Sequence, residues 1–437
     1  MTQPRHDPPL GTRLAELAGL FLKLGIIGFG GPAAHIAMME DECVVRRRWL
    51  SREQFMDLVG ATNLIPGPNS TEMTMHIGQL RAGALGLIVA GTCFIVPAVL
   101  IVGVFAWAYA NYGTLPEVGR LMYGIKPAVL ALILVAIWRL GRTAVKNHRL
   151  LVLAIIVALA SYFNWVNEIV ALIGGALIGM AWLRLGQARE AAEGRRRGDD
   201  GGGQGPPSAA PLIALSLWWW ERCTSRVRLL AQHSLIAGPP PEVMAQLAAR
   251  PPWWDIGLVF LQIGSVIYGG GYVLIALLQS AMVEQRGWLT QTQLLDAVAI
   301  GQITPGPLFT TATFVGYIIT ATPGDVASGV PGALAATVGI FLPSFIFVAI
   351  LGRLIPHLRK WTWTAAFMDA VNAAAVALMA AVLVKLAQQV LVDQGQPSWP
   401  AIAIATAAAM ILLRFKVASA WIVVGGAMVG WFVFPWA

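Results

Sequence analysis

The sequence predicts an all-α polytopic membrane protein in which two homologous halves form an inverted repeat. Three observations predict this fold class. Of the 437 residues, 57% are hydrophobic and only 12% are charged, against roughly 25% charged in an average soluble domain. Residues 21–76 align without a gap to residues 260–315, which indicates a duplicated unit. Finally, the loops that follow corresponding apolar segments differ in their basic content, as loops on opposite sides of a membrane do.

Each copy of the duplicated unit contains two backbone breaks inside apolar sequence. At an offset of 239 (260 − 21), Gly30-Gly31 coincides with Gly269-Gly270, and Pro66-Gly67-Pro68 coincides with Pro305-Gly306-Pro307. In a bilayer, backbone groups freed by such breaks are tolerated only where protein buries them or where they line a cavity. Interrupted segments at matching places in two halves indicate a transporter's binding site. We therefore expect broken or re-entrant half-helices at the Gly-Gly and Pro-Gly-Pro motifs of each half.

The first half, residues 1–185, is expected to contain seven apolar segments. Two of them, residues 55–65 and 70–80, flank the first Pro-Gly-Pro motif. Each is too short to cross a hydrocarbon core of about 30 Å, which needs roughly 20 helical residues, so they form a re-entrant pair or one broken helix. The seven segments are residues 14–39, 55–65, 70–80, 83–109, 120–140, 150–163 and 168–183.

Residues 186–252 are expected to form a cytoplasmic linker, because they are basic and rich in Gly and Pro. An apolar stretch within the linker, residues 212–220, is too short to span and is expected to lie at the membrane interface. The second half, residues 253–437, repeats the plan of the first. Its expected segments are residues 254–282, 294–304, 308–320, 328–351, 365–388, 401–413 and 417–434.

Loop charges predict that the two halves are inverted. Residues 111–119 contain no Lys or Arg, whereas the corresponding residues 352–361 contain three. One segment later the order reverses, because residues 141–149 contain three basic residues and residues 390–398 contain none. Basic loops stay cytoplasmic, so corresponding loops lie on opposite sides of the membrane. The C-terminus is then outside, while the side of the N-terminus stays open.

Small polar residues after both Pro-Gly-Pro motifs predict an oxyanion site. Asn69-Ser70-Thr71 follow the first motif, and Thr310-Thr311 lie just beyond the second. A helix that begins there directs N–H groups and a positive dipole end toward the break. The alternative is that the breaks only allow close helix packing. The predicted substrate-binding residues are Gly30, Gly31, Asn63, Gly67, Pro68, Asn69, Ser70, Thr71, Lys126, Gly269, Gly270, Gln302, Gly306, Pro307, Thr310 and Thr311.

Ionisable residues inside apolar sequence are the candidates for proton coupling, because charge is costly in a bilayer. Glu72 and His76 are four residues apart and therefore share one helix face; the alternative is a local hydrogen-bonded pair. Asp57 and Asp296 occupy the same position of the repeat, where a structural capping role is the alternative.

The sequence carries no feature of an enzyme. The three cysteines are scattered, so neither a metal site nor a disulfide framework is expected. We find no nucleophile–base triad and no nucleotide motif, and we therefore expect neither a cofactor nor ATP-driven transport. The net charge of +8 indicates basic cytoplasmic loops rather than a nucleic-acid partner.

The motifs of both halves resemble those of the chromate ion transporter (CHR) family, in its long two-domain form. The resemblance rests on Phe29-Gly-Gly-Pro with Pro66-Gly-Pro in the first half, and on Tyr268-Gly-Gly-Gly with Pro305-Gly-Pro in the second. It covers residues 14–434 except the linker. The resemblance implies a secondary transporter that exports chromate across the bacterial inner membrane, driven by the proton motive force, with sulfate as a competitor.

The two breaks differ in one respect that the resemblance does not explain. Asn69-Ser70 follows the first Pro-Gly-Pro motif, but Leu308-Phe309 follows the second, so the two sites are not equivalent. The partners expected are chromate, sulfate, protons and the lipid bilayer, and a homodimer stays open. The alternatives are a transporter of sulfate or another anion and, in a different class, a membrane-embedded enzyme or receptor for a lipid or quinone.

Overall fold

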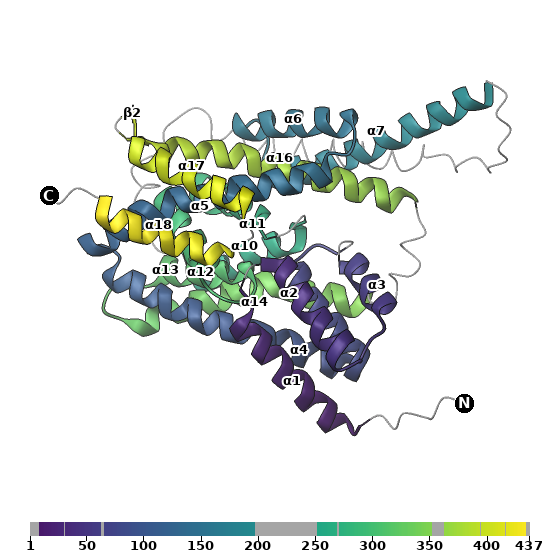
Figure 1. The fold of residues 1–437 in the computed structure, drawn as a ribbon, viewed down its shortest axis with the longest axis horizontal. Coiled ribbons are helices and arrows are strands. Elements are labelled where there is room, and N and C mark those ends of the chain that lie inside the picture. The colour runs from purple at the N-terminus through teal and green to yellow at the C-terminus, as the bar shows by residue number, and fades with distance from the viewer. Residues whose placement is uncertain are drawn as a thin grey trace.

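A computed structural model describes residues 8–29, 31–62, 65–196, 251–268, 271–351, 362–393, 395–415 and 417–433. The described chain is almost entirely helical, as the sequence predicts (Figure 1). The exceptions are two short strands, β1 (Val392–Asp393) and β2 (Gln396–Pro397), which form a small antiparallel hairpin. Four predicted site residues, together with the apolar stretch 212–220, lie outside the described residues. The four are Gly30, Asn63, Gly269 and Gly270.

The helices of the first half follow the predicted segments. One of them, α7, continues to residue 196, past the predicted start of the linker at residue 186. The elements are α1 (Leu10–Ile27), α2 (Gly31–Glu40), the π-helical turn η1 (Asp41–Arg46), α3 (Arg52–Thr62), α4 (Asn69–Tyr112), α5 (Pro116–Ala144), α6 (His148–Tyr162) and α7 (Glu168–Arg196).

The second half repeats this order of elements. They are α10 (Trp253–Val266), α11 (Val273–Leu278), the π-helical turn η2 (Gln279–Glu284), α12 (Gln291–Ile303), the 3-10 turn η3 (Leu308–Thr310), α13 (Thr311–Thr320), α14 (Val326–Leu351), α16 (Thr362–Leu391), α17 (Trp399–Arg414) and α18 (Ser419–Val433). Among the described residues, five helices are long and apolar enough to cross a membrane. They lie in α4, α5, α7, α14 and α16.

Helix α4 is a helical hairpin rather than one straight rod. Ala82 and Gly83 have non-helical backbone angles, and Gly83 has a φ of 64°. A Cβ added at Gly78 would meet the backbone of Gly86, although eight residues of a continuous helix would place them about 12 Å apart. Residues 69–81 therefore form a half-helix that turns back onto the long span, which confirms the two segments expected there. In the second half, α13 and α14 form the same hairpin, with Gly316 against Gly332.

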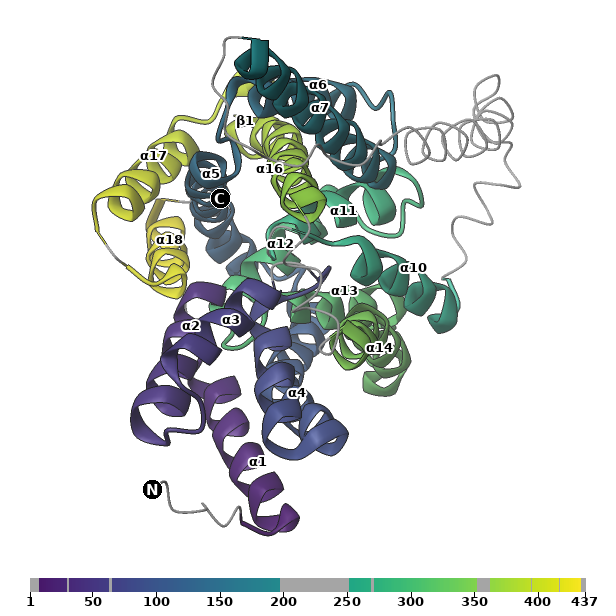
Figure 2. The ribbon, with the colours of Figure 1, turned by 90° about the vertical axis from the view of Figure 1, so that its right-hand side faces the viewer.

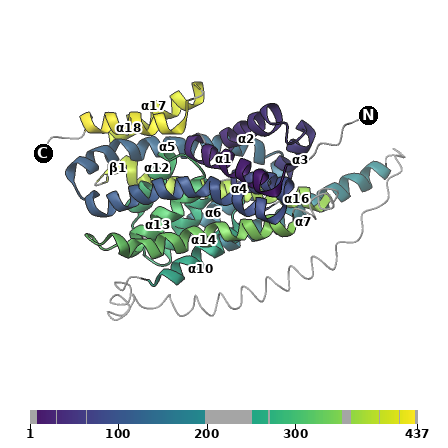
Figure 3. The same cartoon turned by 90° about the horizontal axis from the view of Figure 1, so that it is seen from below.

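The halves interlock through their last helices. Helices α17 and α18 of the second half pack against α5, while α6 and α7 of the first half pack against α16 (Figure 1). The Tyr123 hydroxyl lies 3.3 Å from that of Ser398 at the start of α17, and the Arg139 guanidinium donates to the Leu412 carbonyl near its end. Each half thus completes its bundle with helices from the other half. Figure 3 shows α10 and α14 on one side of this bundle and α17 and α18 on the opposite side.

Corresponding helices run in opposite directions. Lys146 lies just after α5, and its Nζ is 2.6 Å from an Asp369 oxygen near the start of α16, the counterpart of α5. Likewise, the Gly324 N–H just before α14 donates to the Asn111 side chain near the end of α4. Each contact joins the end of one helix to the beginning of its counterpart, which is the arrangement that an inverted repeat requires.

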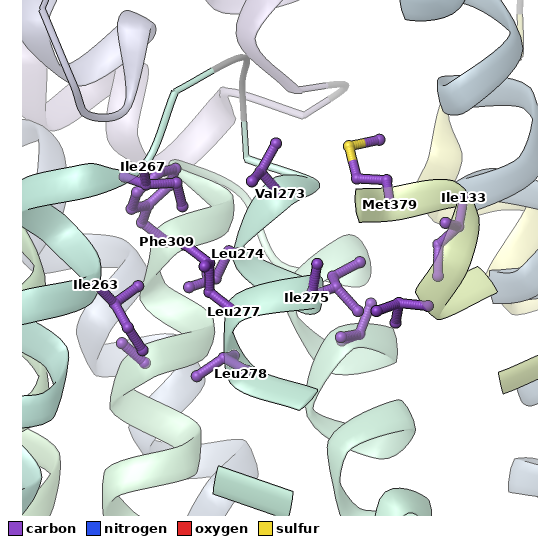
Figure 4. Close-up of a cluster of buried hydrophobic side chains, with 14 of the residues drawn as sticks. Ile133, Ile263, Ile267, Val273, Leu274, Ile275, Leu277, Leu278, Phe309 and Met379 are labelled. Atoms are coloured by element: carbon purple, nitrogen blue, oxygen red, sulfur yellow. The ribbon is translucent and has the colours of Figure 1, made fainter. Parts of the chain in front are cut away.

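The centre of the bundle is an apolar core around α11. Leu274 and Leu277 of this helix are 1% and 2% exposed. Figure 4 shows the side chains of α11 lying between Ile263 of α10 and Phe309 on one side and Met379 of α16 on the other. Because α11 packs against α16 and also contacts α7 of the first half, both halves contribute to this core.

Candidate functional site

The two Pro-Gly-Pro breaks meet the opposite half through the same hydrogen bond, made twice. The Gly67 N–H donates to the Ile267 carbonyl at 2.8 Å, and the Gly306 N–H donates to the Gly28 carbonyl at 2.8 Å. The two bonds are equivalent in the repeat, because 67 + 239 = 306 and 28 + 239 = 267. Each Pro-Gly-Pro break therefore lies against the segment that enters the Gly-Gly break of the other half.

The local sequence explains why these glycines make the bond. Proline has no N–H, so the glycine is the one donor within each Pro-Gly-Pro motif. Gly67 has a φ of 146° and Gly306 a φ of 90°, a backbone region that glycine adopts readily and other residues do not. Both N–H groups are engaged by protein carbonyls in this structure. Within the first turn of α4, the Glu72 N–H donates to the Pro68 carbonyl at 3.0 Å, whereas the N–H groups of Ser70 and Thr71 have no acceptor within the helix.

Polar side chains of both halves converge on the first break. A Cβ added at Gly67 would meet the carboxylate of Glu72 from α4 and the hydroxyl of Ser344 from α14. Both residues are 0% exposed, and neither carboxylate oxygen nor the hydroxyl makes a hydrogen bond of regular geometry. A buried polar group left without a partner costs about 1–3 kcal/mol. Such a group is therefore a candidate for binding something that completes it.

Two further polar atoms without partners lie on the same half-helix. The Thr71 hydroxyl and the His76 Nε2 are buried and make no hydrogen bond. Glu72 does not bond to His76, so the structure does not support the alternative of a local hydrogen-bonded pair. Three residues that the sequence predicted (Thr71, Glu72 and His76) thus lie on the half-helix that follows the first break, and one of them, Glu72, lies beside Gly67 and Ser344.

The second break has the same backbone but its polar groups are satisfied. Gly306 faces the methyl group of Ala98, the counterpart of Ser344 at the offset of 246 (344 − 98) shared by these later segments. Thr311 stands at the position of Glu72 (72 + 239). The hydroxyls of Thr310 and Thr311 donate to the carbonyls of Pro307 and Leu308, both at 2.8 Å. These threonines therefore stabilise the turn.

His35 is a site residue that the sequence analysis missed. Its Nε2 lies 2.9 Å from the Gly28 carbonyl, the same oxygen that accepts the Gly306 N–H. The ring is 1% exposed and meets Phe94 edge to face at 5.3 Å. The available signal was an isolated histidine within the apolar residues 14–39. His35 holds the carbonyl on which the second break rests.

Lys126 and Asp296 form an ion pair between the halves. The Lys126 Nζ on α5 lies 3.4 Å from Asp296 Oδ1 on α12, and the Tyr109 hydroxyl on α4 donates to Asp296 Oδ2 at 2.7 Å. The Asp296 side chain is 3% exposed and that of Lys126 is 23% exposed. The sequence named both residues, Lys126 as an anion ligand and Asp296 for proton coupling, but it did not predict their pairing or the role of Tyr109.

The remaining predicted residues are dispersed around the two breaks. Gly31 begins α2 with a φ of 77° and open space around it. Asn69 begins α4 after Pro68, and Pro307 precedes η3. Ser70 is buried on α4 and Gln302, whose Nε2 has no hydrogen-bond partner, on α12. Asp57, by contrast, is exposed on α3.

Comparison with known proteins agrees with the architecture. A family model described as "Chromate transporter" matches residues 15–180 and 254–431, once in each half. A chromate transport protein of Cupriavidus metallidurans is 27% identical over 98% of this chain and 95% of its own length. One of Pseudomonas aeruginosa is 31% identical over 98% of this chain and 94% of its own length. The uncharacterized transporter YwrA of Bacillus subtilis is 27% identical over only 29% of this chain, but over 71% of its own length. No solved structure matches the chain.

Proposed function

Because the chain belongs to the chromate transporter family, a family of multi-pass membrane proteins, we propose that it is a secondary transporter that exports chromate across the bacterial cytoplasmic membrane. We place the oxyanion site at the first break, between Gly67, Glu72 and Ser344. The observation that carries this placement is the group of buried polar atoms without partners that both halves contribute there. The equivalent atoms of the second break are already hydrogen-bonded or replaced by a methyl group.

The chemistry of the first break fits a tetrahedral dianion. Hydroxyls of Thr71 and Ser344 can donate to two of its oxygens, and the N–H groups of Ser70 and Thr71 in the first turn of α4 can donate to others. The positive end of the α4 dipole adds to this attraction. An anion would thus supply the partners that these donors lack, at a place where the halves meet and can separate.

Glu72 sets the condition under which the anion binds. An ionised carboxylate beside a bound dianion would repel it strongly in a site with little water. We infer that the dianion binds when Glu72 carries a proton, whose O–H is then a further donor. The anion and the proton are therefore present together, and one net negative charge moves in each cycle.

The membrane potential then drives export. Moving one elementary charge across 100 mV is worth about 2.3 kcal/mol. With the cytoplasm negative, outward movement of the anion with one proton gains that energy. Coupling through charge requires no nucleotide.

The test is chromate efflux from proteoliposomes that contain the purified chain. A potassium gradient with valinomycin sets the potential, and a pH gradient of either sign is imposed separately. We expect efflux to rise with a potential that is negative inside, and we expect that acidifying the external side alone does not replace this potential. Sulfate should slow chromate efflux, and sulfate flux as fast as chromate flux would assign the site to both ions. Absence of flux of either ion, in protein that is monodisperse, would contradict the proposal.

A further inference from the structure

Two corresponding helical units flank the breaks and have the same internal structure. The first unit is α2–η1–α3, residues 31–62, and the second unit is α11–η2–α12, residues 273–303. The Trp49 N–H donates to the Cys43 carbonyl and the Trp288 N–H to the Met282 carbonyl, both at 2.8 Å. In both units an arginine lies over that tryptophan, at 5.1 Å in the first and 5.3 Å in the second. The units are therefore copies that each behave as one body.

The two units are packed differently. In the second unit, α12 packs against α5 and α18, and α11 packs against α16. In the first unit, α2 and α3 have their principal contacts with α4. Figure 2 shows α12 in the middle of the bundle, whereas α2 and α3 lie toward its edge beside α1 and α4. A bundle with exact two-fold symmetry would pack both units alike, and this bundle does not.

The exposed fractions of equivalent residues show the difference in packing between the two units. Met56 of α3 is 54% exposed, whereas Leu295, its counterpart on α12 (56 + 239), is 1% exposed. Asp57 is exposed and Asp296 is 2% exposed. Met56 shares its helix face with Glu53, and Glu53 and the adjacent Asp57 are exposed as well. That face of α3 is therefore left uncovered by the rest of the protein.

A polar contact fixes the packed unit, and its counterpart lacks the charge. Asp296 of the second unit binds Lys126 on α5 and Tyr109 on α4, both of the first half. The residue that corresponds to Lys126 is Asn372 (126 + 246). This ion pair can therefore hold only the second unit.

The contact lies on one side of the proposed binding site. Glu72 is 11 residues before the turn of the α4 hairpin at Gly83, and Tyr109 is 26 residues after it (83 − 72 and 109 − 83). At 1.5 Å per helical residue, Tyr109 is roughly 20 Å farther from that turn than Glu72 is. The Tyr109 end of α4 is also where Asn111 meets Gly324. The ion pair, which Tyr109 joins, thus lies toward that face relative to Glu72.

We propose that the two units are the two gates of an alternating-access cycle, and that Tyr109, Lys126 and Asp296 form the lock that holds the second gate shut. This inference rests on the proposed transport function. In this structure the first gate is open and the second is closed. The opposite state exchanges the two packings: α3 moves in against α16 and α7, and α12 leaves α5 and α18. An inverted repeat makes both states accessible through the same motion.

The lock also gives Lys126 a role in the second state. When Asp296 moves away with α12, the Lys126 ammonium loses its counter-ion in a segment that spans the membrane. An unpaired charge there is costly, and a passing dianion would supply the missing partner. Lys126 then binds the anion on its exit, after the gate has opened.

Cysteine reactivity tests the exchange without any substrate. Met56→Cys and Leu295→Cys are introduced singly into a chain with Cys43, Cys93 and Cys223 changed to Ala, and labelled with a water-soluble maleimide. We expect Met56→Cys to react at least tenfold faster than Leu295→Cys. Adding Asp296→Asn should reverse the order, because it removes the ion pair and releases the second gate. Asp325→Asn is the control, because Asp325 is an exposed carboxylate next to Gly324, which meets the Tyr109 end of α4. It should leave the labelling rates of both cysteines unchanged.

Exchanging the two charges of the ion pair distinguishes a released gate from an unfolded protein. Lys126→Asp combined with Asp296→Lys restores an ion pair of opposite polarity, and it should restore the protection of Leu295→Cys. If Asp296→Asn leaves Leu295→Cys protected, there is no lock. If both cysteines become reactive together, the units do not alternate, and the two-gate inference is wrong. Because the readout is labelling, a chain that failed to transport chromate would still give a clear answer here.

Discussion

The two Pro-Gly-Pro breaks have the same backbone and different side chains, and this contrast separates scaffold from site. Both glycines donate to the opposite half with the same 2.8 Å bond. Around Gly67, however, a carboxylic acid and a hydroxyl are buried without a hydrogen bond of regular geometry. Around Gly306 a methyl group fills the space, and threonines bond to their own turn. A break in a helix is thus not sufficient for binding, because the polar groups must also be left available.

Duplication explains how one backbone came to serve both purposes. The shared hydrogen bonds hold the halves together at two equivalent points, so either break could have been the site. Placing the polar groups at only one of them leaves a single binding site, which the two gates can expose alternately.

The largest effect is expected from changing the glycines. We predict that Gly67→Val and Gly306→Val each abolish chromate flux in protein that still inserts. Both positions have positive φ, which a branched side chain does not tolerate, and a Cβ at either would meet neighbouring atoms. Gly324→Val is the control, because Gly324 has a φ of 86° and open space around it. This control introduces the same backbone strain in a loop outside the breaks, so normal flux in Gly324→Val would show that strain alone does not abolish transport.

A second pair of variants sharpens the comparison between the glycines. At Gly306 the nearest obstacle is the Ala98 side chain, so Ala98→Gly should restore part of the flux that Gly306→Ala removes. At Gly67 the obstacles are Glu72 and Ser344, which the proposed mechanism uses, so Ser344→Gly should not rescue Gly67→Ala. Normal flux in both valine variants would show that the breaks are packing devices.

The architecture could be predicted because the repeat is visible without a structure. The offset of 239 aligns both breaks, and apolar segments of sufficient length can hardly fold otherwise in a bilayer. The half-helix with Thr71, Glu72 and His76 followed from the same reasoning, since residues close in sequence stay close on a helix. The turn at Gly83 likewise lies where one expected segment ends and the next begins.

What could not be predicted is the set of residues that distant segments bring to the site. Ser344 reaches Gly67 from a helix more than 270 residues away in sequence (344 − 67 = 277), and its only signal was a serine beside Pro343. The pairing of Lys126 with Asp296 depends on how α5 packs on α12. No spacing in one segment encodes such a contact. The unequal packing of the two units is also invisible in the sequence, because in the proposed cycle it belongs to one of two states.

The next effect in size is a pH dependence of anion flux. Only the first break can give it, because Thr311 stands at the position of Glu72 in the second break. Sulfate is the suitable probe, because its last proton dissociates only in acid and it therefore stays a dianion around neutral pH. We predict that sulfate flux through the unchanged protein falls as the pH rises, since an ionised Glu72 repels the dianion. Glu72→Gln keeps a neutral group of the same shape, and its flux should depend little on pH.

Glu53→Gln is the matched control for Glu72→Gln, because Glu53 is an exposed carboxylate on α3. Its pH profile should follow that of the unchanged protein. Flux that vanishes in Glu72→Gln at every pH would instead mean that the proton must leave Glu72 during the cycle, and the joint movement of proton and anion would be wrong.

The smallest effect is expected from a single hydroxyl exchanged between the breaks. Ser344→Ala removes one donor from the bound anion at the first break. The cost of about 1–3 kcal/mol for a group left short of a hydrogen bond corresponds to roughly 5- to 150-fold in affinity, since 1.4 kcal/mol is tenfold. Ala98→Ser places the hydroxyl at the equivalent point of the second break, where no anion is expected. It should leave chromate affinity unchanged and lower the melting temperature, because the new hydroxyl is buried without a partner.

Equilibrium binding of chromate to the purified chain, with thermal unfolding of the same samples, measures both quantities. Equal affinity in Ser344→Ala and the unchanged protein would remove Ser344 from the site, and weaker binding in Ala98→Ser would mean that both breaks hold the ion.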